Sequence, residues 1–194
     1  MSAHNPVLLL HGRISNHLQM GKLADYLSHL GWQAHSLSLE PSSGELGLEH
    51  WASQIEDYIT KTFSPEQSID LVGFSMGGLA GRHYLQCLGD LGRIQRFISI
   101  ATPHRGTWTA YLLSHLGCRQ MRPNSSFLQT LNQDVEQLAA ISCTSIWTPF
   151  DVVIFPASAS ILPVGNSVWV PILWHDCMPF NDKVLKVVAE TLME

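Results

Sequence analysis

The stretch "LVGFSMGGLAGRHYL", from Leu71 to Leu85, decides the fold. Its first residues form an apolar run typical of a buried strand, and the residues after the serine return to a helix-like apolar pattern. Ser75 stands between Gly73 and Gly77, where the two patterns meet. In a sharp turn from strand to helix, a serine hydroxyl is held clear of the backbone, and flanking glycines leave room for neighbouring chain. The stretch therefore predicts a nucleophilic serine at position 75.

The same turn has a second interpretation. A glycine-rich turn before a helix can bind a phosphate group at the helix N-terminus. The two common phosphate-binding patterns, G-x-x-x-x-G-K-[ST] and a G-x-G-x-x-G after a strand, are missing from this turn. The nucleophile interpretation is therefore favoured.

Outside this stretch, short apolar runs alternate with helical patterns along the chain. Strands are expected at residues 6–10, 32–39, 68–74, 96–100, 143–148 and 167–173. Helices are expected over residues 20–30, 48–63 and 76–88, after a cap at Asn124 and after a cap at Asn181. Residues 103–126 are rich in Pro, Gly, Arg and Ser and are left unassigned. The alternation predicts an α/β fold, with a mostly parallel sheet and helices on both faces.

Composition limits the class of protein. The 194 residues suit one domain over residues 1–194, and 45% hydrophobic against 14% charged residues indicates a globular chain. The net charge is −5 and no basic stripe exists, which argues against nucleic acid as a partner. The N-terminal apolar run, residues 6–10, is too short for a signal peptide or a membrane span. The cysteines form no C-x-x-C pair, so we expect reduced thiols and a cytoplasmic protein; they are Cys87, Cys118, Cys143 and Cys177.

A serine hydroxyl is a weak nucleophile and needs a histidine base. In folds that carry such a turn, the chain order is serine, acid, histidine. His83, His104, His115 and His175 follow the serine, and only His175 comes after a further strand, at its C-terminal edge. Catalytic groups gather at that edge of a parallel sheet. We expect His175 to be the base; the plainer alternative is a surface loop histidine.

The acid is sought between the serine and the base. Asp151 follows the strand that precedes the His175 strand, where a carboxylate can orient the imidazole. The alternative is a turn aspartate after Pro149. Asp176 is expected to point elsewhere. The other acids of this interval, expected on solvated surfaces or outside the site, are Asp90, Asp134 and Glu136.

An oxyanion forms on the substrate during attack and needs N–H donors. The Met76 backbone N–H, at the start of the helix, is one expected donor. The second is expected from the loop "HGRIS", residues 11–15, at the Arg13 N–H, with Ile14 as the alternative. His11 is expected to orient this loop or to pack at the strand end, without a catalytic role.

Together these pieces resemble a known family. The matching segments are "VLLLHG", "LVGFSMGGLAGRHYL", "ISIATPHRGT", "SIWTPFDVVI" and "WHDCMPFNDKVLKVV". In this order they resemble a small lipase or esterase of the α/β-hydrolase superfamily, close to the compact bacterial lipase type. The resemblance implies a minimal fold of about six strands with little or no lid domain. It also implies hydrolysis of carboxylic esters through an acyl-serine, without metal or other cofactor. Arg13 departs from the family, in which an apolar residue is common there.

The substrate is less well defined by sequence. A small-molecule or lipid-like ester with a medium-to-long acyl chain is expected, with transient contact to a membrane surface and an undetermined oligomeric state. Residues 153–170 are expected to form an exposed apolar rim. Several apolar residues fall in segments expected to ring the catalytic edge and suit an apolar acyl pocket; for any single one, packing in the core or at the surface is the alternative. They are Trp108, Tyr111, Leu112, Leu113, Phe127, Phe155, Ile161, Leu162 and Trp174.

Three functions stay open. The first is a serine ester hydrolase. The second is an acyltransferase or thioesterase that uses the same triad, and the third is a non-catalytic binding protein of the same fold. A metal enzyme is not favoured, because no two of the ten histidines lie two, three or four residues apart.

Overall fold

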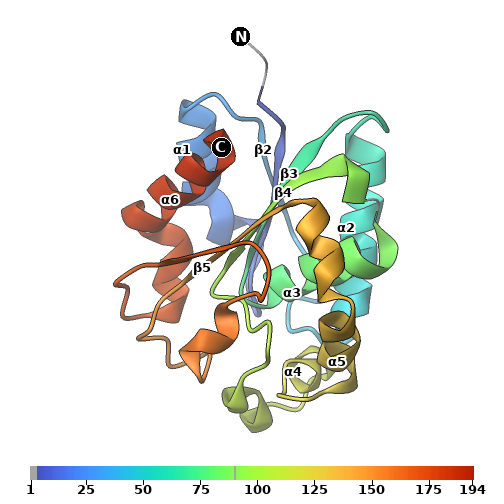
Figure 1. Cartoon of the computed structure of the whole chain (residues 1–194), viewed down its shortest axis with the longest axis vertical. Coiled ribbons are helices and arrows are strands. Elements are labelled where there is room, and N and C mark those ends of the chain that lie inside the picture. The colour runs from blue at the N-terminus through green and yellow to red at the C-terminus, as the bar shows by residue number, and fades with distance from the viewer. Residues whose placement is uncertain (1–3, 90) are drawn as a thin grey trace.

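A parallel sheet of six strands forms the centre of the molecule (Figure 1). The computed structural model describes residues 4–89 and 91–194. The strands lie in the order β2-β1-β3-β4-β5-β6, and every neighbouring pair is parallel. Their bounds are β1 (Val7–Leu10), β2 (Ala34–Leu37), β3 (Ile69–Phe74), β4 (Ile94–Ile100), β5 (Ser142–Trp147) and β6 (Asn166–Trp169). The predicted α/β architecture is confirmed.

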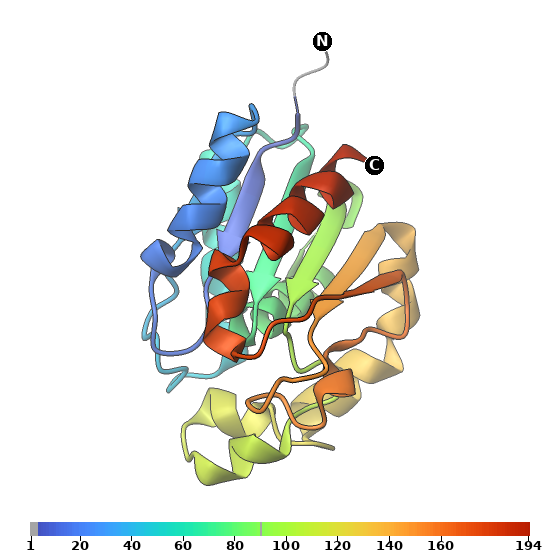
Figure 2. The ribbon, with the colours of Figure 1, turned by 90° about the vertical axis from the view of Figure 1, so that its left-hand side faces the viewer.

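Helices cover both faces of this sheet (Figures 1 and 2). One face carries α1 (Gly21–His29) and α6 (Asp182–Met193), and the other carries α2 (Leu48–Thr62), α3 (Met76–His83) and α5 (Ser126–Gln133). The short helix α4 (Leu116–Gln120) lies beside α5. The single-turn elements are η1 (His17–Met20), η2 (Tyr84–Leu88), η3 (Leu91–Arg93), η4 (Trp108–Leu112), η5 (Val135–Ala140), η6 (Ala157–Ser160) and η7 (His175–Phe180).

Strand β1 shows why an unbroken apolar run predicts a central strand. Successive side chains of a strand point to opposite faces of the sheet. Leu8 and Leu10 enter the core under α2 and α3, whereas Val7 and Leu9 enter the core under α1 and α6. All four are fully buried. A strand covered on both faces has no position for a polar residue, which explains the run "VLLL".

Some boundaries differ from the sequence predictions. The helix expected over residues 76–88 ends at His83 and continues as the wider π-turn η2. The last strand ends at Trp169 instead of residue 173. Helix α5 is capped by Ser125, whose hydroxyl accepts from the Leu128 N–H, whereas Asn124 lies one residue earlier with a φ of 61°. The cap at Asn181 is confirmed, since its side chain accepts from the Lys183 N–H.

The carboxyl ends of the strands point toward one end of the molecule. Figure 2 shows the segments around residues 105–120 and 150–162 beyond the arrowheads of the central strands, with the C-terminal end of α6 at the opposite end. Residues 103–126, which the sequence left unassigned, supply η4 and α4 to this end. Within the described residues, no helix is long and apolar enough to span a membrane.

Candidate active site

Ser75 stands at the turn between β3 and α3, in a strained backbone conformation. Its φ of 51° and ψ of −121° lie in a region that residues other than glycine rarely adopt. The turn is held because the Ser75 N–H donates to the Ile100 carbonyl at 2.8 Å, and the Gly78 N–H donates to the Ser75 carbonyl at 3.1 Å. The side chain projects into an open cavity, as the sequence predicts for a nucleophile.

Three glycines let the chain pass closely around this turn. A Cβ atom on Gly73 would lie 2.5 Å from the Gly78 Cα. A Cβ on Gly77 would overlap the His11 carbonyl oxygen, and one on Gly78 would overlap the Thr102 Oγ1. The glycines are therefore required by close approach of α3 to the ends of β1, β3 and β4.

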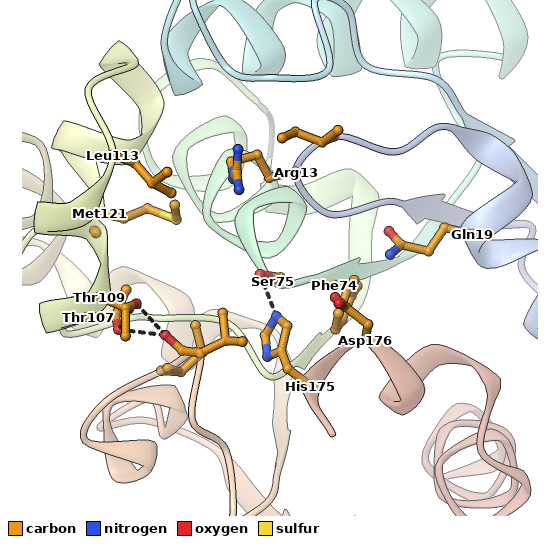
Figure 3. A pocket seen from close by; sticks show the side chains of 14 residues that line it. Arg13, Gln19, Phe74, Ser75, Thr107, Thr109, Leu113, Met121, His175 and Asp176 are labelled. Carbon is orange, nitrogen blue, oxygen red and sulfur yellow. Dashed lines mark hydrogen bonds between the residues drawn. The ribbon is translucent and has the colours of Figure 1, made fainter. Parts of the chain in front are cut away.

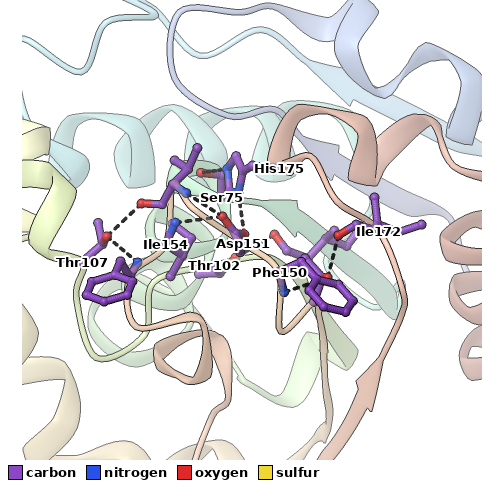
Figure 4. Close-up of polar contacts among 12 residues, drawn as sticks. Ser75, Thr102, Thr107, Phe150, Asp151, Ile154, Ile172 and His175 are labelled. Carbon is purple, nitrogen blue, oxygen red and sulfur yellow. Dashed lines mark hydrogen bonds and ion pairs between the residues drawn. The ribbon is translucent and has the colours of Figure 1, made fainter.

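The structure brings Ser75, His175 and Asp151 together. The His175 Nε2 lies 2.9 Å from the Ser75 Oγ, and the His175 Nδ1 lies 2.8 Å from the Asp151 Oδ2 (Figure 3 and Figure 4). His175 is the first residue of η7, after the loop that follows β6, and Asp151 lies in the loop after β5. All three side chains are buried, which strengthens hydrogen bonds among them.

The Asp151 carboxylate is fixed by the backbone around it. Its Oδ1 accepts from the N–H groups of Val153 and Ile154, both at 2.9 Å (Figure 4). Its Oδ2 is thereby aimed at the His175 ring. A carboxylate that accepts from two backbone N–H groups cannot rotate freely. The loop around Asp151 therefore sets the orientation of the imidazole.

The two expected oxyanion donors come from the start of α3 and from the loop after β1. Met76 is the first residue of α3, directly after the serine. In the loop after β1, the Gly12 N–H donates to the Gln19 Oε1 at 2.8 Å and the Ile14 N–H donates to the Ser42 carbonyl at 2.7 Å. Ile14, the alternative donor, is thus already engaged.

The Arg13 N–H differs from those of its two neighbours. Over the described ranges it has no hydrogen-bond acceptor in the protein. His11 orients the same loop, because its Nε2 accepts from the Leu39 N–H and its Nδ1 contacts the Gly12 carbonyl. Burial lowers the pKa of His11, which suits a neutral ring in this packing role.

A cavity of about 390 Å³ opens above Ser75. Of the apolar residues in the segments expected to ring the catalytic edge, Leu113 lines the cavity, and for the others the alternative of core or surface packing holds. Trp108, Tyr111, Leu112, Phe155 and Trp174 are exposed at the surface instead, whereas Phe127 and Leu162 are buried in the core. The cavity is lined by Arg13, Ile14, Gln19, Phe74, Ser75, Thr107, Thr109, Ala110, Leu113, Met121, Val153, Ile154, His175 and Asp176.

Several of these lining residues escaped the sequence analysis. Asp176 does line the cavity, contrary to expectation, although it makes no ion pair with the His175 ring within the described part of the chain. The Thr107 and Thr109 hydroxyls both donate to the Val153 carbonyl, at 2.8 Å and 2.5 Å (Figure 3). The Thr107 hydroxyl also accepts from the Phe155 N–H at 2.9 Å. No sequence pattern marks such contacts, because the partners are more than 40 residues apart.

The residues outside the triad offer no cluster for a metal. Among residues 4–89 and 91–194, no group of three His, Cys, Asp or Glu side chains is placed to hold an ion. The four cysteines are all free thiols. The groups that the cavity does present include the Ser75 hydroxyl, the His175 imidazole and the Asp176 carboxylate.

Comparisons with known proteins identify a family and a fold. The sequence model of the palmitoyl protein thioesterase family matches residues 6–150. No curated protein matches the chain. Among solved structures, Aspergillus fumigatus lipase B superposes with a TM-score of 0.86 at 18% identity, over 98% of this chain and 53% of that one. This chain thus spans about half the length of that lipase.

Two further solved structures match over nearly their whole length. The mature form of Bacillus licheniformis lipase BlEst2 gives a TM-score of 0.79 at 14% identity, over 99% of this chain and 93% of that one. Polyneuridine aldehyde esterase gives 0.68 at 13% identity, over 98% of each chain. At such low identities these structures establish the shared fold. The fold and the family match lead to one conclusion: the chain has the α/β-hydrolase fold and belongs to the palmitoyl protein thioesterase family.

Proposed function

We propose that this protein hydrolyses carboxylic esters through an acyl-serine intermediate. The observation that carries the proposal is the continuous chain of contacts from Ser75 through His175 to Asp151, at 2.9 Å and 2.8 Å. Each contact lies within the range required for proton transfer or for orientation of a base. The coarser conclusion, a hydrolase, also agrees with the family to which the chain belongs.

The acylation step follows from the positions of these atoms. Asp151 accepts from the Nδ1–H of His175, which leaves Nε2 free to accept a proton. The Ser75 Oγ attacks the ester carbon while its proton passes to Nε2. The imidazolium then gives this proton to the departing alcohol oxygen as the ester C–O bond breaks. Asp151 stabilises the imidazolium in the meantime.

Deacylation uses the same groups in reverse. Water attacks the acyl carbon and gives one proton to the His175 Nε2. That proton returns to the Ser75 Oγ as the carboxylic acid leaves. In both steps the negative charge on the carbonyl oxygen is stabilised by the backbone N–H groups of Met76 and Arg13. Loss of one such donor typically costs about 10² to 10³ in rate.

The proposed substrate is a lipid-like ester with a medium-to-long acyl chain. Support comes from exposed apolar side chains on the segments next to the cavity, among them Leu112 at 85% exposure and Trp174 at 67%. Phe155 and Trp169 expose part of the predicted apolar rim, whereas Ile154 is buried. Such side chains suit transient contact with a lipid surface. A series of nitrophenyl esters that peaks at the acetyl ester would contradict this substrate class.

A thioesterase is the second candidate, because the matching family is described by that activity. Thioesters pass through the same acyl-serine, so the triad alone does not separate the two. A thioester and an oxygen ester with the same acyl group, compared by kcat/KM, distinguish them. Added alcohol acceptors test the acyltransferase alternative, since a transferred acyl group appears as a new ester.

The first experiment is labelling with a fluorophosphonate probe. We expect one label per protein on Ser75, loss of the label in Ser75→Ala and slow labelling in His175→Ala, because the imidazole activates the hydroxyl. Mass spectrometry of the adduct checks the site. A folded protein that neither labels nor cleaves short esters would contradict the proposed catalysis and favour the non-catalytic binding protein.

A further inference from the structure

The Arg13 side chain is a cation without a protein partner at the edge of the cavity. Over the described ranges, no hydrogen-bond acceptor or carboxylate lies within bonding distance of its guanidinium. Arg119 also lacks an acceptor there, but its side chain is exposed to solvent. The guanidinium groups that do donate to oxygen atoms are those of Arg82, Arg93, Arg96, Arg105 and Arg122. A half-buried guanidinium with free donors is suited to bind an external anion.

The loop after β1 holds Arg13 in this position. The residue before it is anchored through Gln19, and the residue after it is anchored through Ser42. Ile14 has a φ of 53°, which turns the chain sharply at this point. The side chain of Arg13 is thereby directed into the cavity near Ser75 (Figure 3).

The position of Arg13 relative to His175 indicates which part of the substrate Arg13 faces. Figure 3 shows the Arg13 side chain and the His175 ring on opposite sides of Ser75. The leaving group must lie near the His175 Nε2, from which it takes a proton. The acyl chain therefore extends away from His175, toward Arg13, Leu113 and Met121, which line the same part of the cavity.

This acyl side carries positive charge. Arg122 donates to the Leu113 carbonyl at 2.9 Å, and its guanidinium stacks on the Tyr111 ring. The pKa of the Cys118 thiol is affected by both cations. Burial raises this pKa, whereas the positive charges of Arg13 and Arg122 each lower it. The carboxylate in the lining, Asp176, lies beside Phe74, away from Leu113 and Met121 (Figure 3).

We propose that the acyl side of the cavity binds an acyl chain that ends in a carboxylate, held by the Arg13 guanidinium. The substrate class is then a half-ester, or half-thioester, of a dicarboxylic acid. Leu113 and Met121 contact the methylene groups, and Arg13 pairs with the terminal carboxylate. This inference rests on the proposed esterase function and narrows its substrate.

The test compares two esters that differ only in this charge: mono-4-nitrophenyl adipate and methyl 4-nitrophenyl adipate. Release of nitrophenolate gives kcat/KM for each, after subtraction of the rate with Ser75→Ala. We expect the wild-type protein to prefer the charged ester. In Arg13→Gln the ratio of the two kcat/KM values should fall about tenfold or more, because a charge-assisted contact is lost. The ratio in Arg13→Lys should lie between those two values, because lysine keeps the positive charge but lacks the planar guanidinium that can donate two hydrogen bonds to one carboxylate.

Lys186→Gln is the matched control. It removes one positive charge from an exposed position on α6, outside the cavity lining. The ratio should stay at the wild-type value in this variant. A wild-type preference for the neutral ester, an unchanged ratio in Arg13→Gln, or an equal fall in Lys186→Gln would each overturn the inference.

A binding measurement separates this inference from the proposed catalysis. Titration of adipate into the Ser75→Ala variant, followed by calorimetry, should show binding that Arg13→Gln weakens about tenfold or more. Adipate binding without hydrolysis of either ester would support the subsite and contradict the esterase. Hydrolysis of the neutral ester without adipate binding would support the esterase and contradict the subsite.

Discussion

Asp151 divides its two carboxylate oxygens between the backbone and the imidazole. Oδ1 accepts from two backbone N–H groups and Oδ2 faces the His175 Nδ1. An asparagine at this position has one oxygen and one amide group. If the oxygen keeps the two backbone contacts, the amide N–H₂ faces Nδ1, which must then accept. The ring proton is forced onto Nε2, where it blocks transfer from Ser75.

Asp151→Asn should therefore lower kcat for ester hydrolysis by about 10³ to 10⁴ at neutral pH, with a small change in KM. Steady-state kinetics on a short nitrophenyl ester checks this. Asp176→Asn is the matched control, because Asp176 lines the cavity but, among the described residues, makes no ion pair with the His175 ring. Equal losses in the two variants would show that cavity charge, and not imidazole orientation, explains the effect.

At the level of single residues, the sequence predicts the three side chains that the structure brings together. Chain order and position after each strand were sufficient for Ser75, Asp151 and His175, because the carboxyl ends of parallel strands meet at one edge. The choice between Arg13 and Ile14 as donor was open in the sequence. It depends on the Ser42 carbonyl, which occupies the Ile14 N–H from a different loop. A backbone contact between two separate loops cannot be predicted from the residue pattern of either loop.

Helix α3 packs against the ends of three strands with almost no space to spare. The Gly78 Cα faces the Thr102 side chain, and a Cβ there would overlap its hydroxyl oxygen. The helix also carries Arg82, which is fully buried and donates to the His104 and Leu131 carbonyls. Burial lowers the pKa of Arg82 to about 10, which still leaves it charged at neutral pH. Close packing and these contacts together fix the helix that presents Ser75.

Gly78→Ala should lower the free energy of unfolding by more than about 2 kcal/mol, because the methyl group displaces Thr102 or the helix. Urea denaturation measures the change. In the double variant Gly78→Ala/Thr102→Ala, part of the overlap is removed, so the two effects should be less than additive. Gly21→Ala is the control: nothing lies within 4 Å of its added Cβ, and its φ is −58°, so it should be neutral or stabilising. Additive losses would contradict the proposed steric cause.

At the level of elements, strands and long helices were predictable, and short elements were not. Apolar periodicity located α2 and α6, since each buries one continuous face. Elements of one turn, such as η4, bury too few residues to show a period. The cap of α5 shifted from Asn124 to Ser125 because both residue types can cap a helix, and only the local backbone decides between them.

Among the described residues, four histidines have lowered pKa values, and burial is the first cause in each case. They are His11, His35, His83 and His104. His104 is fully buried, and the charges of Arg82 and Arg105 lower its pKa further. Below about pH 6.5 the unfolded chain binds protons at these four rings, whereas the folded protein binds fewer protons there because the pKa values are lowered. Stability should therefore rise with pH through this window.

Urea denaturation at pH 7.5, 6.5 and 5.5 should show a loss of unfolding free energy as the pH falls below about 6.5. Each fully buried histidine contributes up to about 1.4 kcal/mol per pH unit until its folded pKa is reached. Burial raises the pKa of Asp70, so this carboxyl acts in the opposite direction when the solution is more acidic, and the series therefore stops at pH 5.5. His104→Gln should flatten the slope, even if the variant is less stable. An unchanged slope in His104→Gln would contradict the contribution of His104 to the pH dependence of the unfolding free energy.

The cavity is the part of the whole molecule that sequence predicts least. Its lining comes from the loop after β1, the ends of β3 and η4, and the loops that carry Asp151 and His175. Two neighbouring apolar residues, Tyr111 and Leu112, fall in a segment expected to ring the catalytic edge, but their side chains are exposed at the surface. The direction of a side chain in a short irregular segment depends on tertiary contacts that its own neighbours in sequence do not reveal.

The contacts of Val153 have a consequence for protein engineering. Its N–H holds the Asp151 carboxylate, while its carbonyl holds the hydroxyls of Thr107 and Thr109. One peptide segment thus serves both as a support of the catalytic acid and as a wall of the cavity. Efforts to reshape the specificity of this protein at either threonine would disturb the acid at the same time. The side chains of Leu113 and Met121 also line the cavity, and among the described residues they make no hydrogen bond to Val153 or Asp151, so mutant libraries at these two positions can change acyl selectivity while turnover is retained.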